Sequence, residues 1–69
     1  MSNPQKYQLM WRLQMATGST YYALENLLDV YARRFPQNRR AIELLKIIVY
    51  SPGPVEDQTV DEAIELIYR

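Results

Sequence analysis

The absence of both cysteine and histidine is the feature that most limits what this 69-residue chain can fold into. No disulfide can form, and structural zinc, haem and iron–sulfur sites lose their usual ligands. A monomer of this size also buries only roughly 60% of the surface that its unfolded chain exposes. Small domains without disulfides or metals commonly gain stability by self-association. We therefore expect residues 1–69 to form one small domain, stabilised by a well-packed core or by a homodimeric partner.

The formal net charge of zero conceals two halves of opposite sign. Residues 1–40 carry six basic and two acidic side chains, a balance of +4, whereas residues 41–69 carry two basic and six acidic ones, a balance of −4. The two fields largely cancel beyond a Debye length, which is about 10 Å at 0.1 M salt. We interpret the division as a short-range orienting device that acts within one chain or between two chains.

The clearest helical pattern lies between residues 19 and 36. Its apolar side chains recur at spacings of three and four, as on one face of a helix, and they are Tyr21, Leu24, Leu28, Tyr31 and Phe35. Ser19 or Thr20 is the expected N-cap, since either hydroxyl can accept a hydrogen bond from a free backbone N–H. Pro36 ends the pattern because it disfavours the α conformation at the residue before it.

Two further helices are predicted towards the C-terminus. The first begins after Asn38 and reaches Tyr50, and seven of the nine residues 41–49 are apolar, which is typical of a buried central helix. Its end, residues 47–50, is rich in β-branched side chains, so a strand is the alternative there. Residues 51–58 are expected to be a connecting loop. A capping box at Thr59 then begins the last helix, whose apolar stripe is Val60, Ala63, Ile64 and Ile67.

Residues 7–15 fit two structures. Apolar and polar positions alternate, except at Met10, with the period of a strand, and the alternating apolar residues are Tyr7, Leu9, Trp11, Leu13 and Met15. However, an isolated strand is unstable, and Gln, Met, Leu and Arg are good helix formers. We predict an all-α bundle of three to four short helices, preceded by a flexible terminus at residues 1–5. The alternative is a strand over residues 7–15 followed by helices.

No catalytic arrangement is found in the sequence. The serines have no His partner for a triad, Lys6 and Lys46 lie in no activating motif, and two glycines cannot form a phosphate-binding loop. Carboxylates four residues apart at Asp57, Asp61 and Glu65 are interpreted as a solvated helix face. We expect no enzyme activity, no cofactor, no metal and no small-molecule substrate.

Membrane insertion is not expected either. The most apolar stretch, residues 41–50, is interrupted by Glu43 and Lys46 and is far shorter than the ~20 residues that span a bilayer. The first residues lack the apolar run of a signal peptide. We therefore expect a soluble, cytoplasmic protein.

Four arginines are the first group of candidate binding residues. They flank the helix break at Pro36, and they are Arg33, Arg34, Arg39 and Arg40. Guanidinium groups beside a helix N-terminus suit phosphate or another anion. In the alternative interpretation, the arginines pair with the acidic half of the same chain.

Three aromatic residues are the second group. Tyr22, Tyr50 and either Trp11 or Tyr7 are difficult to place in one small core, whereas Tyr21, Tyr31 and Phe35 lie on the predicted core stripe. Tyr and Trp are enriched at protein interfaces, where both the ring and its polar end are used. We therefore consider Trp11, Tyr22 and Tyr50 candidate interface residues.

Two functional hypotheses follow. The first is a protein-interaction module, homodimeric, that acts as a regulator, inhibitor or adaptor. The second depends on a strand at residues 7–15, because the order strand–helix–helix over residues 7–50 is similar to that of ribbon–helix–helix repressors. That resemblance implies that the paired strands enter the major groove of DNA and that the reading residues are Gln8, Met10, Arg12 and Gln14. It leaves the acidic last segment to bind a protein partner. A protein is the first choice of partner and nucleic acid the second.

Overall fold

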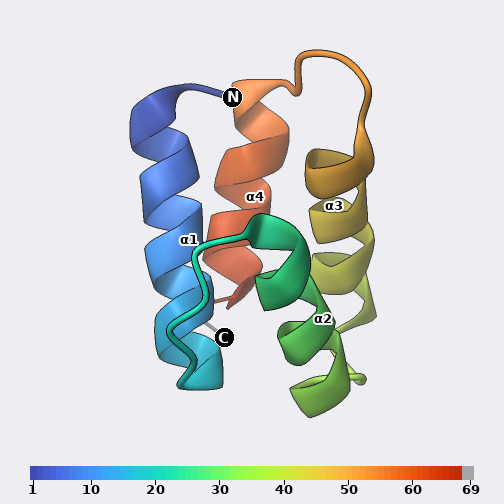
Figure 1. Cartoon of the computed structure of the whole chain (residues 1–69). Helices are drawn as coiled ribbons and strands as arrows, with labels where there is room; N and C mark the ends of the chain where they lie inside the picture. The colour runs from blue at the N-terminus through green and yellow to red at the C-terminus, as the bar shows by residue number, and fades with distance from the viewer. Residues whose placement is uncertain (68–69) are drawn as a thin grey trace.

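Four helices make up the part of the chain that the computed structural model describes, residues 1–67 (Figure 1). They are α1 (Asn3–Thr17), α2 (Leu24–Arg34), α3 (Arg39–Tyr50) and α4 (Asp57–Ile67). The predicted small all-helical bundle is therefore confirmed.

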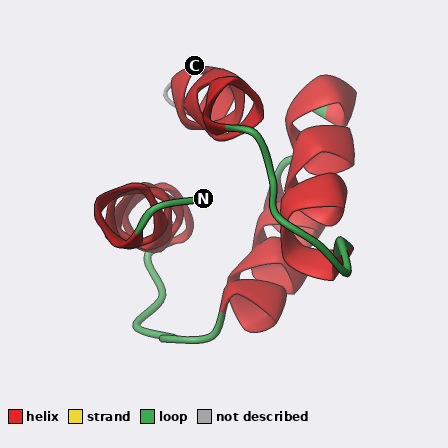
Figure 2. Ribbon diagram, turned by 90° about the horizontal axis from the view of Figure 1, so that it is seen from above, coloured by secondary structure: helices red, strands yellow, loops and turns green. Residues whose placement is uncertain are grey.

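The helices stand at four corners, and each packs against two neighbours. α1 and α3 both contact α2 and α4 but do not contact each other, as the view from above shows (Figure 2). Buried apolar side chains from all four helices meet between them, and they are Leu9, Met10, Leu13, Leu27, Leu28, Tyr31, Ala41, Leu44, Leu45, Ile48, Val60, Ala63, Ile64 and Ile67. The fold thus has one core, to which the N-terminal and C-terminal helices contribute side by side.

The alternative of a strand at residues 7–15 is wrong, because these residues lie within α1. Both ends of α1 carry strong local signals. Ser2 Oγ accepts a hydrogen bond from Gln5 N at 3.3 Å, and Gln5 Oε1 accepts one from Ser2 N at 3.2 Å, which forms a capping box. At the other end, Gly18 adopts a left-handed conformation with φ of 68° and donates its N–H to Gln14 O at 2.8 Å.

The apparent alternation in this segment is produced by two helical stripes. Leu9 and Leu13 are four residues apart and fully buried. Tyr7, Trp11 and Met15 are also four residues apart and lie on the opposite, exposed side. Each stripe repeats with the spacing of a helix face, and together they reproduce a period of two. The caps at Ser2 and Gly18, together with the packing of α1 against α2 and α4, distinguish this arrangement from a strand.

The chain start also differs from the flexible terminus expected at residues 1–5. Residues 3–5 form the first turn of α1, and Ser2 is its cap. The Met1 ammonium donates a hydrogen bond to Val55 O at 3.0 Å, and Gln5 Nε2 donates to Asp57 O at 3.2 Å and to Asp61 Oδ1 at 3.1 Å. These contacts attach the first residues to the beginning of α4.

The beginning of α2 was predicted too early. α2 starts at Leu24, and the preceding Ala23 provides no side-chain cap. Ser19 and Thr20 therefore do not cap it, and Tyr21 is half exposed in the 18–23 connection, not part of the core. The reason is a tertiary contact: Gln14 Nε2 donates to Tyr21 O at 2.7 Å and holds the connection against α1.

The predicted capping box at Thr59 is absent, because α4 begins two residues earlier, at Asp57. The N–H groups of Thr59 and Val60 instead donate to Glu56 O at 3.1 and 3.3 Å. The loop between α3 and α4 therefore covers residues 51–56.

α3 is not the central helix that its apolar sequence suggested, since it occupies a corner and leaves Ile47 48% exposed.

The two stripes of α1 predict different effects on stability. We expect Leu13→Ala to lower the free energy of unfolding by about 2–5 kcal/mol, because it opens a cavity in the core. Met15→Ala on the outward stripe should change it by no more than about 0.5 kcal/mol. Urea denaturation followed by circular dichroism measures both values. Equal losses would contradict the assignment of inner and outer faces.

Candidate interaction surface

Exposed large apolar side chains are concentrated on α1 and on the connection that follows it. Seven of them are exposed within residues 1–67, and five of the seven belong to α1 and the 18–23 connection. We call these five the aromatic face: Tyr7, Trp11, Met15, Tyr21 and Tyr22. Their exposed fractions range from 50% for Tyr21 to 83% for Tyr22.

The aromatic face occupies the position where a bundle helix normally carries charge. Tyr7, Trp11 and Met15 point away from the core, directly opposite Leu9 and Leu13. α1 is therefore apolar on two opposite sides, and only the inner side is covered by the fold.

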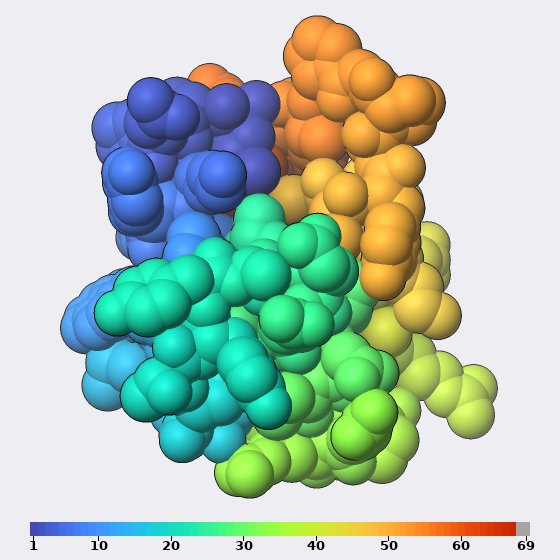
Figure 3. All heavy atoms as spheres, in the orientation of Figure 1, coloured from blue at the N-terminus to red at the C-terminus, as the bar shows by residue number. Residues whose placement is uncertain are grey.

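The connection extends this surface beyond the helix. The hydrogen bond from Gln14 to Tyr21 O fixes the backbone next to α1, and Thr17 Oγ1 lies 3.2 Å from Ser19 Oγ. Figure 3 shows the connection lying against α1 on the side turned to the viewer. The backbone that carries Tyr21 and Tyr22 is thereby held beside α1.

The segment that carries the aromatic face has no acidic residue of its own, and the acid bonded to α1 is Asp61 of α4, whose Oδ1 accepts from Gln5 Nε2 at 3.1 Å. Residues 1–24 contain no Asp or Glu, and their basic side chains are Lys6 and Arg12. The Arg12 guanidinium carbon lies 5.0 Å from the centroid of the Trp11 ring, within the range of a cation–π interaction. Beside it, a depression of about 210 Å³ is lined by Arg12, Met15, Ala16 and Ile67.

The residues assigned to DNA reading do not form a row. Gln8 is exposed, Arg12 is partly buried over Trp11, and Gln14 is engaged with Tyr21 O. Met10, which the same resemblance assigned to the reading set, is part of the core. The paired strands that the ribbon–helix–helix hypothesis requires are replaced by α1, so that hypothesis loses its structural basis.

The four arginines are not brought together as one anion site. Arg33 Nη2 pairs with Asp29 Oδ2 at 2.8 Å within α2. Arg40 pairs with Glu43 at 3.1 Å and with Glu62 at 3.2 Å, and the second pair joins α3 to α4. Arg34 and Arg39 are exposed and form no ion pair with any residue from 1 to 67.

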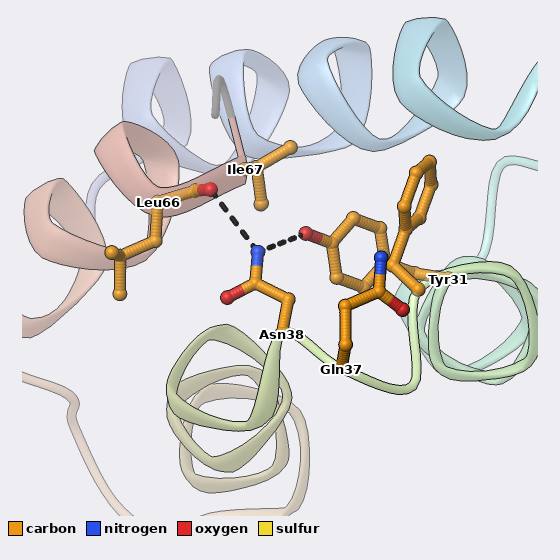
Figure 4. Close-up of a pocket in the computed structure, with 6 residues that line it drawn as sticks. Tyr31, Gln37, Asn38, Leu66 and Ile67 are labelled. Carbon is orange, nitrogen blue, oxygen red and sulfur yellow. Dashed lines mark hydrogen bonds between the residues drawn. The ribbon is translucent and has the colours of Figure 1, made fainter.

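A second hollow, of about 330 Å³, lies where the end of α4 meets the connection between α2 and α3 (Figure 4). Asn38 Nδ2 donates to Tyr31 Oη at 2.8 Å and to Leu66 O at 3.3 Å, so one side chain joins three helices. The Tyr31 and Phe35 rings pack with centroids 4.9 Å apart. The described residues lining this hollow are Tyr31, Phe35, Gln37, Asn38, Leu66 and Ile67.

Sequence reasoning found part of the aromatic face. It selected Trp11 and Tyr22, which are exposed on α1 and on the connection beside it, and Tyr50, which lies apart on α3 next to Ile47. It named Tyr7 only as an alternative to Trp11, and it missed Met15. Their spacing of four residues on either side of Trp11 was the available signal, but it has that meaning only once residues 7–15 are known to be helical.

The described residues 1–67 show neither a metal-ligand cluster nor a membrane-spanning helix. Among residues 1–67, no three His, Cys, Asp or Glu side chains are grouped as a metal site would require. In the same part of the chain, no helix has both the length and the apolar character of a bilayer span. Comparisons with protein-family models, curated proteins and solved structures find no match to this chain.

The Asn38 contact predicts a loss of stability at high pH. Burial raises the pKa of Tyr31 above its ordinary value of 10.0, and the hydrogen bond from Asn38 acts in the opposite direction. The folded state therefore holds the phenol proton more tightly than the unfolded state does. The protonated Tyr31 phenol therefore contributes to the free energy of unfolding. That contribution is fully present below pH 10.0 and is lost as the pH rises through the raised pKa of Tyr31 in the folded state.

Thermal or urea denaturation from neutral to alkaline pH, with Tyr31→Phe as the comparison, tests this expectation. The variant should lose about 1 kcal/mol at neutral pH, because one hydrogen bond is removed, and should show a weaker decline above pH 10.0 than the wild type. Parallel declines for the two proteins would show that Tyr31 does not contribute.

Proposed function

We propose that this chain is a cytoplasmic, non-enzymatic protein-interaction module that acts as a regulator, inhibitor or adaptor through the aromatic face. One observation supports the proposal above all others. The outward side of α1 carries Tyr7, Trp11 and Met15 where an exposed bundle helix normally carries charged side chains.

The composition of the face matches that of protein interfaces. Tyr, Trp, Met and Arg are enriched at such interfaces, whereas Lys, Glu and Asp are depleted. The aromatic face consists of three Tyr, one Trp and one Met, with Arg12 packed over Trp11 and with no acidic residue in the first 24 positions. Trp11 lies in the middle of the α1 stripe, which is where residues that dominate binding energy usually lie.

The face is also held in shape before any partner arrives. Three of its five residues stand on α1, whose inner stripe is locked into the core, and the connection that carries the other two is tied to α1 by Gln14. Ordering flexible side chains and loops on binding reduces affinity. A surface built largely on a packed helix avoids much of that loss.

The test compares Trp11→Ala with Ile47→Ala, a control of similar exposure on α3, 48% against 52%. Each tagged protein is used to capture partners from native extract, including untagged copies of itself. Any partner identified by mass spectrometry is then purified and titrated. We expect Trp11→Ala to weaken binding by at least about thirtyfold, as for a residue worth 2 kcal/mol or more.

Ile47→Ala should leave the dissociation constant unchanged. Circular dichroism checks that both variants keep the helical fold. Partners that bind wild type and Trp11→Ala equally well would contradict the proposal, and so would the absence of any partner for the wild type.

A further inference from the structure

The α1 stripe is symmetrical about Trp11. Tyr7 lies four residues before it and Met15 four residues after it, so the three side chains form a straight row along one face. In a two-fold interface, each contact between two different residues occurs twice. An antiparallel pair of α1 helices would place Trp11 on the partner's Trp11 and Tyr7 on the partner's Met15. The second contact is a sulfur–aromatic one, which is favourable.

The exposed area agrees with that of a dimer. A fully buried aromatic side chain removes 150–250 Å² from water, and the five residues of the aromatic face are 50–83% exposed. Covering all five would bury about 600 Å² per protomer, or about 1,200 Å² in total, which is the lower end of the range for stable interfaces. The described chain exposes 4677 Å² altogether, so this is a substantial share of its surface.

Dimerisation would also add to the stability of so small a domain. It is 69 residues long and has no cysteine to form a disulfide. Domains of this size draw little stability from a single core and commonly add to it by oligomerisation. A second copy covering the uncovered side of α1 would enlarge the buried apolar volume without any new element of structure.

From these observations, and on the basis of the proposed function, we infer that the partner of the aromatic face is a second copy of this chain. Two α1 helices pack antiparallel across a two-fold axis at Trp11, and Tyr21 and Tyr22 extend the contact.

The charges give this dimer a distinctive dependence on salt. Each α1 contributes Lys6 and Arg12 and no carboxylate, so two like-charged helices meet. Salt screens their repulsion, and self-association should therefore strengthen as salt is added. An acidic protein bound to the same face would show the opposite dependence, because salt screens attraction as well.

The first experiment measures the dimer dissociation constant by sedimentation equilibrium between about 50 mM and about 500 mM NaCl. The wild type is compared with Trp11→Lys and with Ile47→Lys, the matched control on α3. We expect a dimer that tightens with salt, a dissociation constant at least tenfold higher for Trp11→Lys, and no change for Ile47→Lys. Circular dichroism should show the same helical signal for all three proteins.

A second experiment tests the antiparallel register by exchanging charges. Tyr7→Glu and Met15→Lys should each weaken the dimer, whereas the double variant should restore it, because each new carboxylate then faces a new ammonium on the partner. A parallel pair would bring like charges together and would stay weak. Both positions are exposed on the outward side of α1, so the fold should tolerate the changes.

The outcomes separate this inference from the proposed function. A wild type that stays monomeric, yet captures another protein through Trp11, overturns the inference and leaves the proposed function standing. A dimer that Trp11→Lys does not weaken also overturns it. A monomer that captures no partner overturns both.

Discussion

Burial of the inner stripe of α1 is the constraint on which the rest of the structure depends. Leu9 and Leu13 are fully buried, and α1 is packed against both α2 and α4. The chain has no cysteine to form a disulfide between the helices, and residues 1–67 contain no cluster of metal ligands. The hydrogen bonds of Met1 and Gln5 to the beginning of α4 follow from the same packing. Once the inner stripe is fixed, the opposite row of Tyr7, Trp11 and Met15 must face outward.

Local signals in the sequence predict the last three helices but not the first. The spacing of three and four in α2 and α4 has one interpretation, and the dense apolar run of α3 left a strand open only at residues 47–50. In α1 two stripes overlap to give a period of two, so its apolar pattern alone does not distinguish a helix from a strand; the caps at Ser2 and Gly18 and the neighbouring helices favour the helix. The start of α2 was misplaced for a similar reason: Ser19 and Thr20 are good cap residues, but the bond from Gln14 to Tyr21 O keeps the connection beside α1. Helix existence is thus encoded locally here, whereas helix boundaries depend on tertiary contacts.

The candidate site shows the same division. An excess of aromatic residues over what one core can hold pointed to Trp11 and Tyr22, but Tyr7 and Met15 join them only through the geometry of α1. The arginines were grouped by their positions in the sequence, but the structure gives them different partners. Arg40 reaches Glu62 across the α3–α4 contact, which links the basic and acidic halves of the chain within one molecule. Exposed ion pairs of this kind contribute about 0–1 kcal/mol to the free energy of unfolding. We therefore interpret the division of charge as a factor that orients neighbouring helices more than it stabilises them.

The side chains of the outer stripe suit a surface that is sometimes covered and sometimes not. A row of Leu or Ile would stabilise a permanent contact but would leave only hydrocarbon in water when the partner is absent. Tyr and Trp combine a large ring with a polar O–H or N–H that can remain hydrated. Met adapts its flexible side chain to an irregular neighbour. With Arg12 stacked on Trp11, the ring is already partly covered in the free chain. The inner stripe, built from Leu9 and Leu13, has no such polar groups and is fully buried in the core. Under the proposed function, one helix carries a permanent apolar side for the fold and a second apolar side for a partner.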